Sequence, residues 1–241
     1  MNIVNLVVFI LIITASLNTW AACTINAAYT PYYTKPIIDH FLDDFHTSIQ
    51  EKTGCNLTVT TNKDDNAYLS RLLNNDYTLS IIPYNLLDDV KVVGANILRK
   101  YTDPKNGLRT IIIANKEASQ QLTIDDLKDQ LILTPGRYSS SYEFLKQSLE
   151  AAGIFNKDNI DVDTPHELII TKILSHEVKF GSTSTLTFSM LSKELQSKFT
   201  IIKQSEPLIN FLITPSSTPK EITKAIIDSV RHIKVHPWVE P

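Results

Sequence analysis

The sequence predicts an α/β protein in which strands and helices alternate along the chain. Short apolar stretches, at residues 79–82 and 108–114, have the length and the β-branched content of buried strands. Between such stretches, apolar side chains recur at helical spacing, as at Ile37, Phe41, Phe45 and Ile49. Because this order of elements places neighbouring strands in parallel with helices on both faces, we expect a mostly parallel sheet.

The first half of the chain contains four predicted strands, at residues 24–28, 57–59, 79–82 and 108–114. Pro36 opens a helix that runs to Ile49, and Gly54 ends this unit before the second strand. A shorter helix is expected around residues 68–73, and Pro83 stops the strand that follows it.

The second half repeats this style without repeating the sequence. Strands are predicted at residues 131–134, 160–162, 178–180, 199–203 and 208–214. Helices are predicted at residues 123–127, 139–152, 165–174, 186–195 and 219–233, with Gly153 as the C-terminal stop of the second. Two of these helices begin with the same device, Thr-Pro-x-Glu at residues 164–167 and 218–221. This pattern indicates a capping box with proline at the first helical position.

Composition limits the function classes open to the chain. Hydrophobic residues make up 43% and charged residues 20% of the 241 residues, which excludes a disordered or fibrous protein. The net charge is 23 − 26 = −3 and no long basic run exists, so nucleic acid is not an expected partner. Six glycines and two cysteines also exclude collagen-like chains and small disulfide-dense scaffolds.

Residues 1–22 have the layout of a secretory signal peptide. They contain no charged side chain, and an apolar run over residues 3–13 is followed by small residues, with cleavage expected after Ala21 or Ala22. A retained membrane anchor is the rival interpretation, but the apolar run is short of the ~20 residues that a span needs. A lipid-anchored form, in which Cys23 becomes the first residue, is disfavoured by Trp20 three places earlier. We therefore expect a protein exported to the periplasm.

The two cysteines of the exported chain, Cys23 and Cys55, each stand where a predicted strand begins. If these strands lie side by side and parallel, their starts come within bridging range. A disulfide over this separation of 32 residues would contribute about 3–4 kcal/mol in the chain-entropy model. The alternative is two unpaired buried thiols, and an oxidising compartment favours the bridge.

Motifs for catalysis and for metal binding are absent from the sequence. It contains no GxxxxGK phosphate loop, GxGxxG, GxSxG or HExxH. The histidine pairs His40/His46 and His232/His236 are interpreted as surface or capping residues, and the doublets of adjacent aspartates as solvated faces or helix N-terminal charges. We therefore expect neither an enzyme nor a metal or cofactor site.

One segment, residues 134–142, has the character of an anion-binding turn. It follows a buried strand, opens a helix and carries Ser139, Ser140 and Ser141, with Arg137 close by. Free N–H groups at such a helix N-terminus, three hydroxyls and a guanidinium can hold an oxyanion. The alternative is that one serine caps the helix while the others face solvent. His166, in the first turn of another helix, is either a further donor or a helix-start residue without a ligand.

Four stretches together resemble one protein family: residues 122–128 (LTIDDLK), 131–135 (LILTP), 139–142 (SSSY) and 151–154 (AAGI). Their order is similar to the second-lobe opening of the periplasmic phosphate, phosphite and phosphonate-binding proteins of ABC transporters. His166, the segment from Asp65 to Tyr68 and the segment 205–207 (SEP) are similar to further family positions, so the resemblance covers about residues 24–230. The sequence departs from the family where Ser141 replaces the usual glycine and where Arg137-Tyr138 suggest an inserted residue.

The resemblance implies the type 2 periplasmic-binding fold, with two α/β lobes, a ligand cleft between them and two chain crossovers. The expected lobes are residues 23–113 plus 206–241 and residues 114–205. In this fold Ser139, Ser140 and Ser141 would hold an oxyanion head, His166 would donate to it, and the hydroxyl of Tyr68 would reach it from the opposite lobe. No cofactor is implied, and the protein is expected to act as a monomer that serves an ABC permease.

Two other function classes fit the same fold. One is a ligand sensor that presents its closed form to a membrane kinase or cyclase. The other is an enzyme such as a lyase, which the export signal and the lack of an acid–base set disfavour. The sequence also predicts a ligand without an amine, because residues 178–182 (VKFGS) carry no acid and a buried ammonium would be unpaired. Glu206 is the nearby acid that could overturn this expectation.

Overall fold

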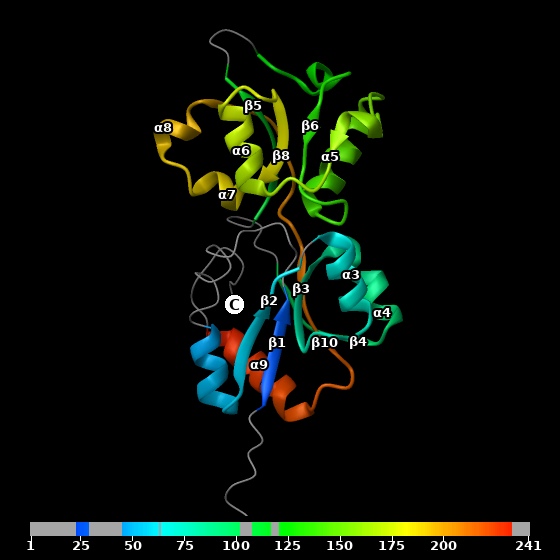
Figure 1. The fold of residues 1–241 in the computed structure, drawn as a ribbon, viewed down its shortest axis with the longest axis vertical. Helices are drawn as coiled ribbons and strands as arrows, with labels where there is room; N and C mark the ends of the chain where they lie inside the picture. The colour runs from blue at the N-terminus through cyan, green and yellow to red at the C-terminus, as the bar shows by residue number, and fades with distance from the viewer. Residues whose placement is uncertain (1–22, 29–44, 63, 102–107, 117–120, 233–241) are drawn as a thin grey trace, which may run out of the picture.

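The computed structural model describes residues 23–28, 45–62, 64–101, 108–116 and 121–232, and these form two α/β lobes. Figure 1 shows the lobes one above the other along the long axis of the molecule, each built around a sheet of five strands. The observed architecture confirms the predicted α/β class.

The sheet of the first lobe has the strand order β2-β1-β3-β10-β4. Its parallel part consists of β1 (Thr24–Ala28), β2 (Asn56–Thr60) and β3 (Leu79–Pro83). The strand β10 (Asn210–Pro215) runs antiparallel to both of its neighbours, β3 and β4 (Ala95–Tyr101).

The sheet of the second lobe repeats this arrangement with the order β7-β6-β8-β5-β9. Here β7 (Ile160–Asp161), β6 (Ile132–Leu133) and β8 (Phe180–Ser184) are parallel. The strand β5 (Thr110–Asn115) runs antiparallel to β8 and to β9 (Phe199–Gln204). In each sheet a single strand therefore opposes the other four, which refines the expectation of a mostly parallel sheet.

The opposing strand in each sheet is the one by which the chain enters that lobe. β5 follows β4 of the first lobe, and β10 follows β9 of the second, so the chain changes lobe twice, as expected. Between the lobes the two crossing segments run side by side, because Ser205 N donates to the carbonyl of Thr110 and Leu208 N to that of Leu108. β5 lies wholly in the second sheet, so residues 110–113 pair there and not in the first lobe, where the sequence analysis places them.

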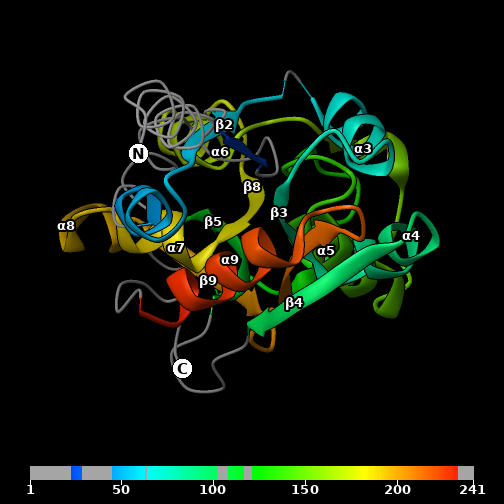
Figure 2. The same cartoon turned by 90° about the horizontal axis from the view of Figure 1, so that it is seen from below.

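Helices cover both faces of the first sheet. Residues 45–53 are helical and confirm the end of the predicted first helix, whose earlier part lies outside the described residues. The remaining helical elements of this lobe are α3 (Asp65–Leu73), η1 (Tyr84–Leu86), α4 (Leu87–Val92) and α9 (Lys220–His232). Seen from below, α3 and α4 lie on one side of the lobe and α9 on another (Figure 2).

In the described part of the second lobe the helical elements are η2 (Ile124–Leu127), α5 (Ser140–Ala151), η3 (Lys157–Asn159), α6 (His166–Leu174), α7 (Thr185–Ser189) and α8 (Lys193–Gln196). Three predictions need correction here. The strand predicted at 178–180 lies at 180–184, and the helix predicted at 186–195 is two helices, capped by Ser184 and Ser192. Pro165 rather than Thr164 holds the N-cap position of α6, with no side-chain cap, so the predicted capping box is wrong.

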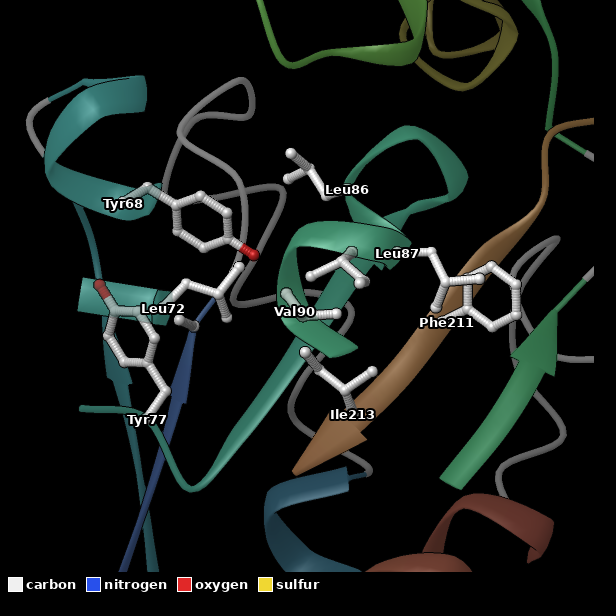
Figure 3. Close-up of a cluster of buried hydrophobic side chains, with 10 residues drawn as sticks. Tyr68, Leu72, Tyr77, Leu86, Leu87, Val90, Phe211 and Ile213 are labelled. Atoms are coloured by element: carbon white, nitrogen blue, oxygen red, sulfur yellow. The ribbon is translucent and has the colours of Figure 1, made fainter. Parts of the chain in front are cut away.

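Each sheet separates two hydrophobic clusters. In the first lobe one cluster joins Ile25 and Leu79 to Ile49 and to Ile226 of α9. The other, drawn in Figure 3, packs side chains of α3 and α4 against β3 and β10. In the second lobe the run at residues 111–113 is divided, with Ile112 in one cluster and its two neighbours in the other. This alternation is the pleat of a strand buried on both faces.

The predicted disulfide between Cys23 and Cys55 is present, with the two Cα atoms 4.7 Å apart. The cysteines immediately precede Thr24 and Asn56, which are partners in the parallel pairing of β1 and β2. The predicted signal peptide, residues 1–22, lies outside the described residues. Within the described part of the chain, no helix has the length and apolarity needed to cross a bilayer.

Candidate functional site

The carboxyl ends of the parallel strands in the second lobe gather three helix N-termini at one edge of the sheet. The chain leaves β6 for α5, β7 for α6 and β8 directly for α7. In open α/β sheets, ligands bind in the crevice outside this edge. In Figure 1 the arrowhead of β8 points toward the first lobe, and the arrowheads of β1 and β2 point back toward the second. The carboxyl-terminal edges of the parallel strands in the two sheets thus face each other.

The serine turn forms the start of α5. Ser139 is the N-cap: its Oγ accepts a hydrogen bond from Tyr142 N at 3.0 Å, and the side chain is buried. Ser140 and Ser141 are therefore the first two helical residues, whose N–H groups have no partner inside the helix. One serine caps the helix, as in the alternative interpretation, but Ser141 is only 3% exposed and does not face solvent.

His166 begins α6 and is buried beside the end of β8. Its Nδ1 accepts a hydrogen bond from Ser184 N at 3.3 Å, and the hydroxyl of Thr183 lies 2.9 Å from the same atom. Burial lowers the pKa of the His166 imidazole to about 3, so the ring is neutral at physiological pH. A neutral ring that accepts at Nδ1 carries its proton on Nε2, which is thereby a hydrogen-bond donor.

Buried hydroxyls connect the serine turn to the strands behind it. Ser182 donates to the carbonyl of Ser141 at 3.1 Å, and the Oγ of Ser141 lies 3.4 Å from that of Thr110. Thr134, at the end of β6, is fully buried, and its hydroxyl has no hydrogen-bond partner among the described residues. A buried hydroxyl without a partner is unfavourable, so this position suits a site that takes up a polar ligand or water.

The first lobe contacts this turn through two residues that the sequence analysis did not assign to the site. The carboxylate of Asp65 accepts a hydrogen bond from Tyr138 N at 3.4 Å, and the amide of Asn85 donates to Tyr138 O at 2.9 Å. A Cβ atom at Gly136 would overlap the Asp65 carboxylate. Asp65 is buried, so this half of the Asp64-Asp65 doublet is not a solvated charge. Contacts between residues this far apart in the chain leave no local sequence signal.

Tyr68 lies in the core of the first lobe. Its side chain is fully buried, its ring stacks on Tyr77 with centroids 6.1 Å apart, and its hydroxyl donates to Ile81 O at 3.3 Å (Figure 3). Burial, with a smaller effect of the charges at Tyr77 and Asp65, raises the pKa of the Tyr68 phenol. In this conformation the hydroxyl is bonded within its own lobe, and its contact with a ligand stays a prediction.

Arg137 and Glu206 have exposed side chains. Arg137 lies in the loop before α5, whereas Glu206 lies in the crossing segment after β9. The structure therefore brings the serines and His166 together in one lobe and leaves Arg137 at the loop surface. Among the described residues, no group of three or more His, Cys, Asp or Glu side chains is close enough to hold a metal ion.

Comparison with known proteins identifies similar chains. Residues 27–234 match the model of the family described as "ABC transporter, phosphonate, periplasmic substrate-binding protein". The structure of PhnD1 from Prochlorococcus marinus (MIT 9301) in complex with methylphosphonate is similar at a TM-score of 0.74 and 12% identity, covering 89% of this chain and 86% of that one. No curated protein sequence matches the chain.

Two further solved structures share the fold. A binding protein component of an ABC phosphonate transporter (PA3383) from Pseudomonas aeruginosa has a TM-score of 0.69 and 15% identity, over 86% of this chain and 73% of that one. The tungstate ABC transporter from Geobacter sulfurreducens has a TM-score of 0.60 and 14% identity, over 86% and 93% of the two chains. At these identities the likeness establishes the fold.

Proposed function

We propose that this chain, which belongs to the family of periplasmic phosphonate-binding components of ABC transporters, captures a small phosphoryl-type oxyanion between its lobes. One observation carries the proposal: the start of α5, with its serines, and the buried His166 lie at the same sheet edge. We place the mature protein in the periplasm, where it would deliver its ligand to a permease.

The N-terminus of α5 would hold the oxyanion head. The N–H groups of Ser140 and Ser141 point out of the first helical turn, and the helix dipole favours negative charge there. Nε2 of His166 would donate from the start of α6, as a neutral group that needs no counter-charge when buried. Arg137, at the loop surface, would add positive charge at the entrance.

Binding would bring the lobes together by a hinge at the two crossing segments. Ser205 links these segments, because its carbonyl accepts from the Arg109 guanidinium at 2.8 Å and its hydroxyl accepts from Thr110 N at 2.9 Å. A pair of adjacent, cross-bonded segments can bend together while each lobe keeps its own core. Small-angle scattering should record a compaction with saturating ligand in Asp65→Ala, which lacks the carboxylate contact between the lobes. Unchanged dimensions of this variant despite binding would argue for a rigid site within one lobe.

Calorimetric titration of the mature protein with methylphosphonate, phosphite, phosphate and tungstate tests the proposal. We expect binding of at least one phosphoryl anion, and no binding of any of them would overturn it. Ser140→Ala should weaken binding about tenfold or more, because it removes the hydroxyl that would donate to the oxyanion head and leaves the N–H group in place; a hydrogen bond to a charged group is worth about 1.5–3 kcal/mol. Ser148→Ala is the matched control, since Ser148 is a buried serine further along the same helix.

A second pair of measurements separates the remaining functions. The binding role predicts that bound phosphonate is recovered chemically unchanged, whereas turnover would favour an enzyme on this fold. The transport role predicts that cells without the protein lose uptake of the ligand. Unchanged uptake together with an altered cellular response would favour the sensor role.

A further inference from the structure

Among the described residues, a carboxylate of the first lobe contacts the loop of the second lobe that leads into α5. Asp65 is the first residue of α3 and is 6% exposed. Its Oδ2 accepts from Tyr138 N, at 3.4 Å, one residue before the N-cap of α5. The ring of Tyr138 also packs against the hydrophobic cluster of the first lobe, and its carbonyl accepts from Asn85. Tyr138 is thus bound to the first lobe by both backbone polar groups and by its ring.

The backbone at Gly136 allows the carboxylate to come this close. A side chain at position 136 would take the space that the Asp65 carboxylate occupies. The Asp65 carboxylate consequently lies against the backbone of Gly136, which has no side chain. This position is at the positive end of α5, where a negative charge is stabilised. This is also the end of the helix at which the proposed function places the oxyanion.

We propose that Asp65 is an internal anion that competes with the ligand for the N-terminal loop of α5. This inference rests on the proposed function. In the free protein the carboxylate bonds Tyr138 N and so holds the lobes together. An incoming oxyanion brings a second negative charge to the same helix end, and two anions a few ångströms apart repel each other. The carboxylate must therefore leave the loop before the lobes can close on the ligand, and Asp65 sets the affinity.

The sign of the effect of Asp65 on affinity tests the proposal. Calorimetry with methylphosphonate should show that Asp65→Ala binds about tenfold more tightly than the wild type, since a hydrogen bond to a charged group is lost only from the free state. Asp65→Asn, which keeps an acceptor oxygen but removes the charge, should give a smaller gain. Asp64→Asn is the matched control: it removes a charge from the neighbouring position and keeps an N-cap side chain for α3. It should bind like the wild type.

Two outcomes would overturn the proposal. Equal or weaker binding by Asp65→Ala would mean that the carboxylate is irrelevant or contacts the ligand favourably, for example through an ammonium group. A spin-label distance across the lobes of the free protein gives a readout that needs no ligand: Asp65→Ala should increase the open population, and Asp64→Asn should not. A wild type that binds no oxyanion would instead refute the proposed function, and the distance measurement would still test the lobe contact.

Discussion

The substitution Gly136→Ala tests whether the lobe contact depends on the bare backbone at this position. The added methyl group would overlap the Asp65 carboxylate, which is short, buried and attached to the first turn of α3. Either the carboxylate turns away from Tyr138 N or the lobes separate. The first response removes a hydrogen bond to a charged group, worth about 1.5 kcal/mol at the lower end of its range because of its 3.4 Å length.

The bond from Asn85 to Tyr138 O does not add to this effect, because it breaks whenever the lobes separate, in the wild type as in the variant. The loss of about 1.5 kcal/mol from the closed form corresponds to a factor of about ten in the ratio of open to closed molecules. Gly136→Ala should therefore increase this ratio about tenfold.

Pulsed electron–electron double resonance between two spin labels measures the ratio of open to closed molecules. Val92→Cys on α4 and Glu150→Cys on α5 place one exposed label on each lobe, and the native cysteines are bonded to each other and do not react. A double-mutant cycle completes the test. In the Asp65→Ala background, Gly136→Ala should cause no further opening, because its target is gone. An unchanged distance distribution in the single variant, or full opening in both backgrounds, would refute the reasoning.

Three further predictions concern stability and ligand choice. The pKa of His166 is lowered to about 3 by burial, so its contribution to stability is present above the ordinary pKa of about 6.5 and is lost as the pH falls toward 3. Urea unfolding should show that wild type loses about 2 kcal/mol more than His166→Asn between pH 7.5 and pH 5, and equal losses would contradict this. Replacing Cys23 and Cys55 by serine should lower the free energy of unfolding by about 4 kcal/mol, from the separation of 32 residues; a loss under 1 kcal/mol would contradict the pairing's role. Calorimetry should show that an alkyl phosphonate binds better than its aminoalkyl analogue, and tighter binding of the amine, lost in Glu206→Gln, would reverse this prediction.

Local patterns in the sequence predicted most of the elements that surround the site. The strand near residues 131–134, the helix that starts at the serine turn and the stop at Gly153, which has φ +70°, follow from propensity, periodicity and turn chemistry. The strand β4 and the helix α4 were missed because β4 is an edge strand with several exposed side chains and has no continuous apolar run.

Long-range contacts were the part of the site that the sequence could not predict. The Asp64-Asp65 doublet has the same composition as a solvated pair, and only the fold makes one member a cap and buries the other. Tyr68 stands at a position typical of a binding residue, yet the packing of α3 on β3 directs its hydroxyl to Ile81. The burial of Asp65 and the direction of the Tyr68 hydroxyl both depend on which element packs against α3, and no local sequence pattern specifies that element.

At the carboxyl-terminal edge of the second sheet, where α5, α6 and α7 begin, the loop before α5 suits one negative charge. That charge can come from the chain or from a ligand, and the hydrogen-bond donors at this edge explain why. His166 is neutral, and the serine and threonine groups around it are dipoles. Among the buried groups of this edge the positive end of α5 is therefore the main electrostatic feature, with Arg137 at the loop surface. A helix end stabilises about half a charge, which is enough for a single anion and too little for two. If an oxyanion binds here as proposed, a closed lobe pair with Asp65 in place and a closed pair with the oxyanion in place are alternatives. Exchange between them then requires opening at the contact that Gly136, Tyr138 and Asn85 form.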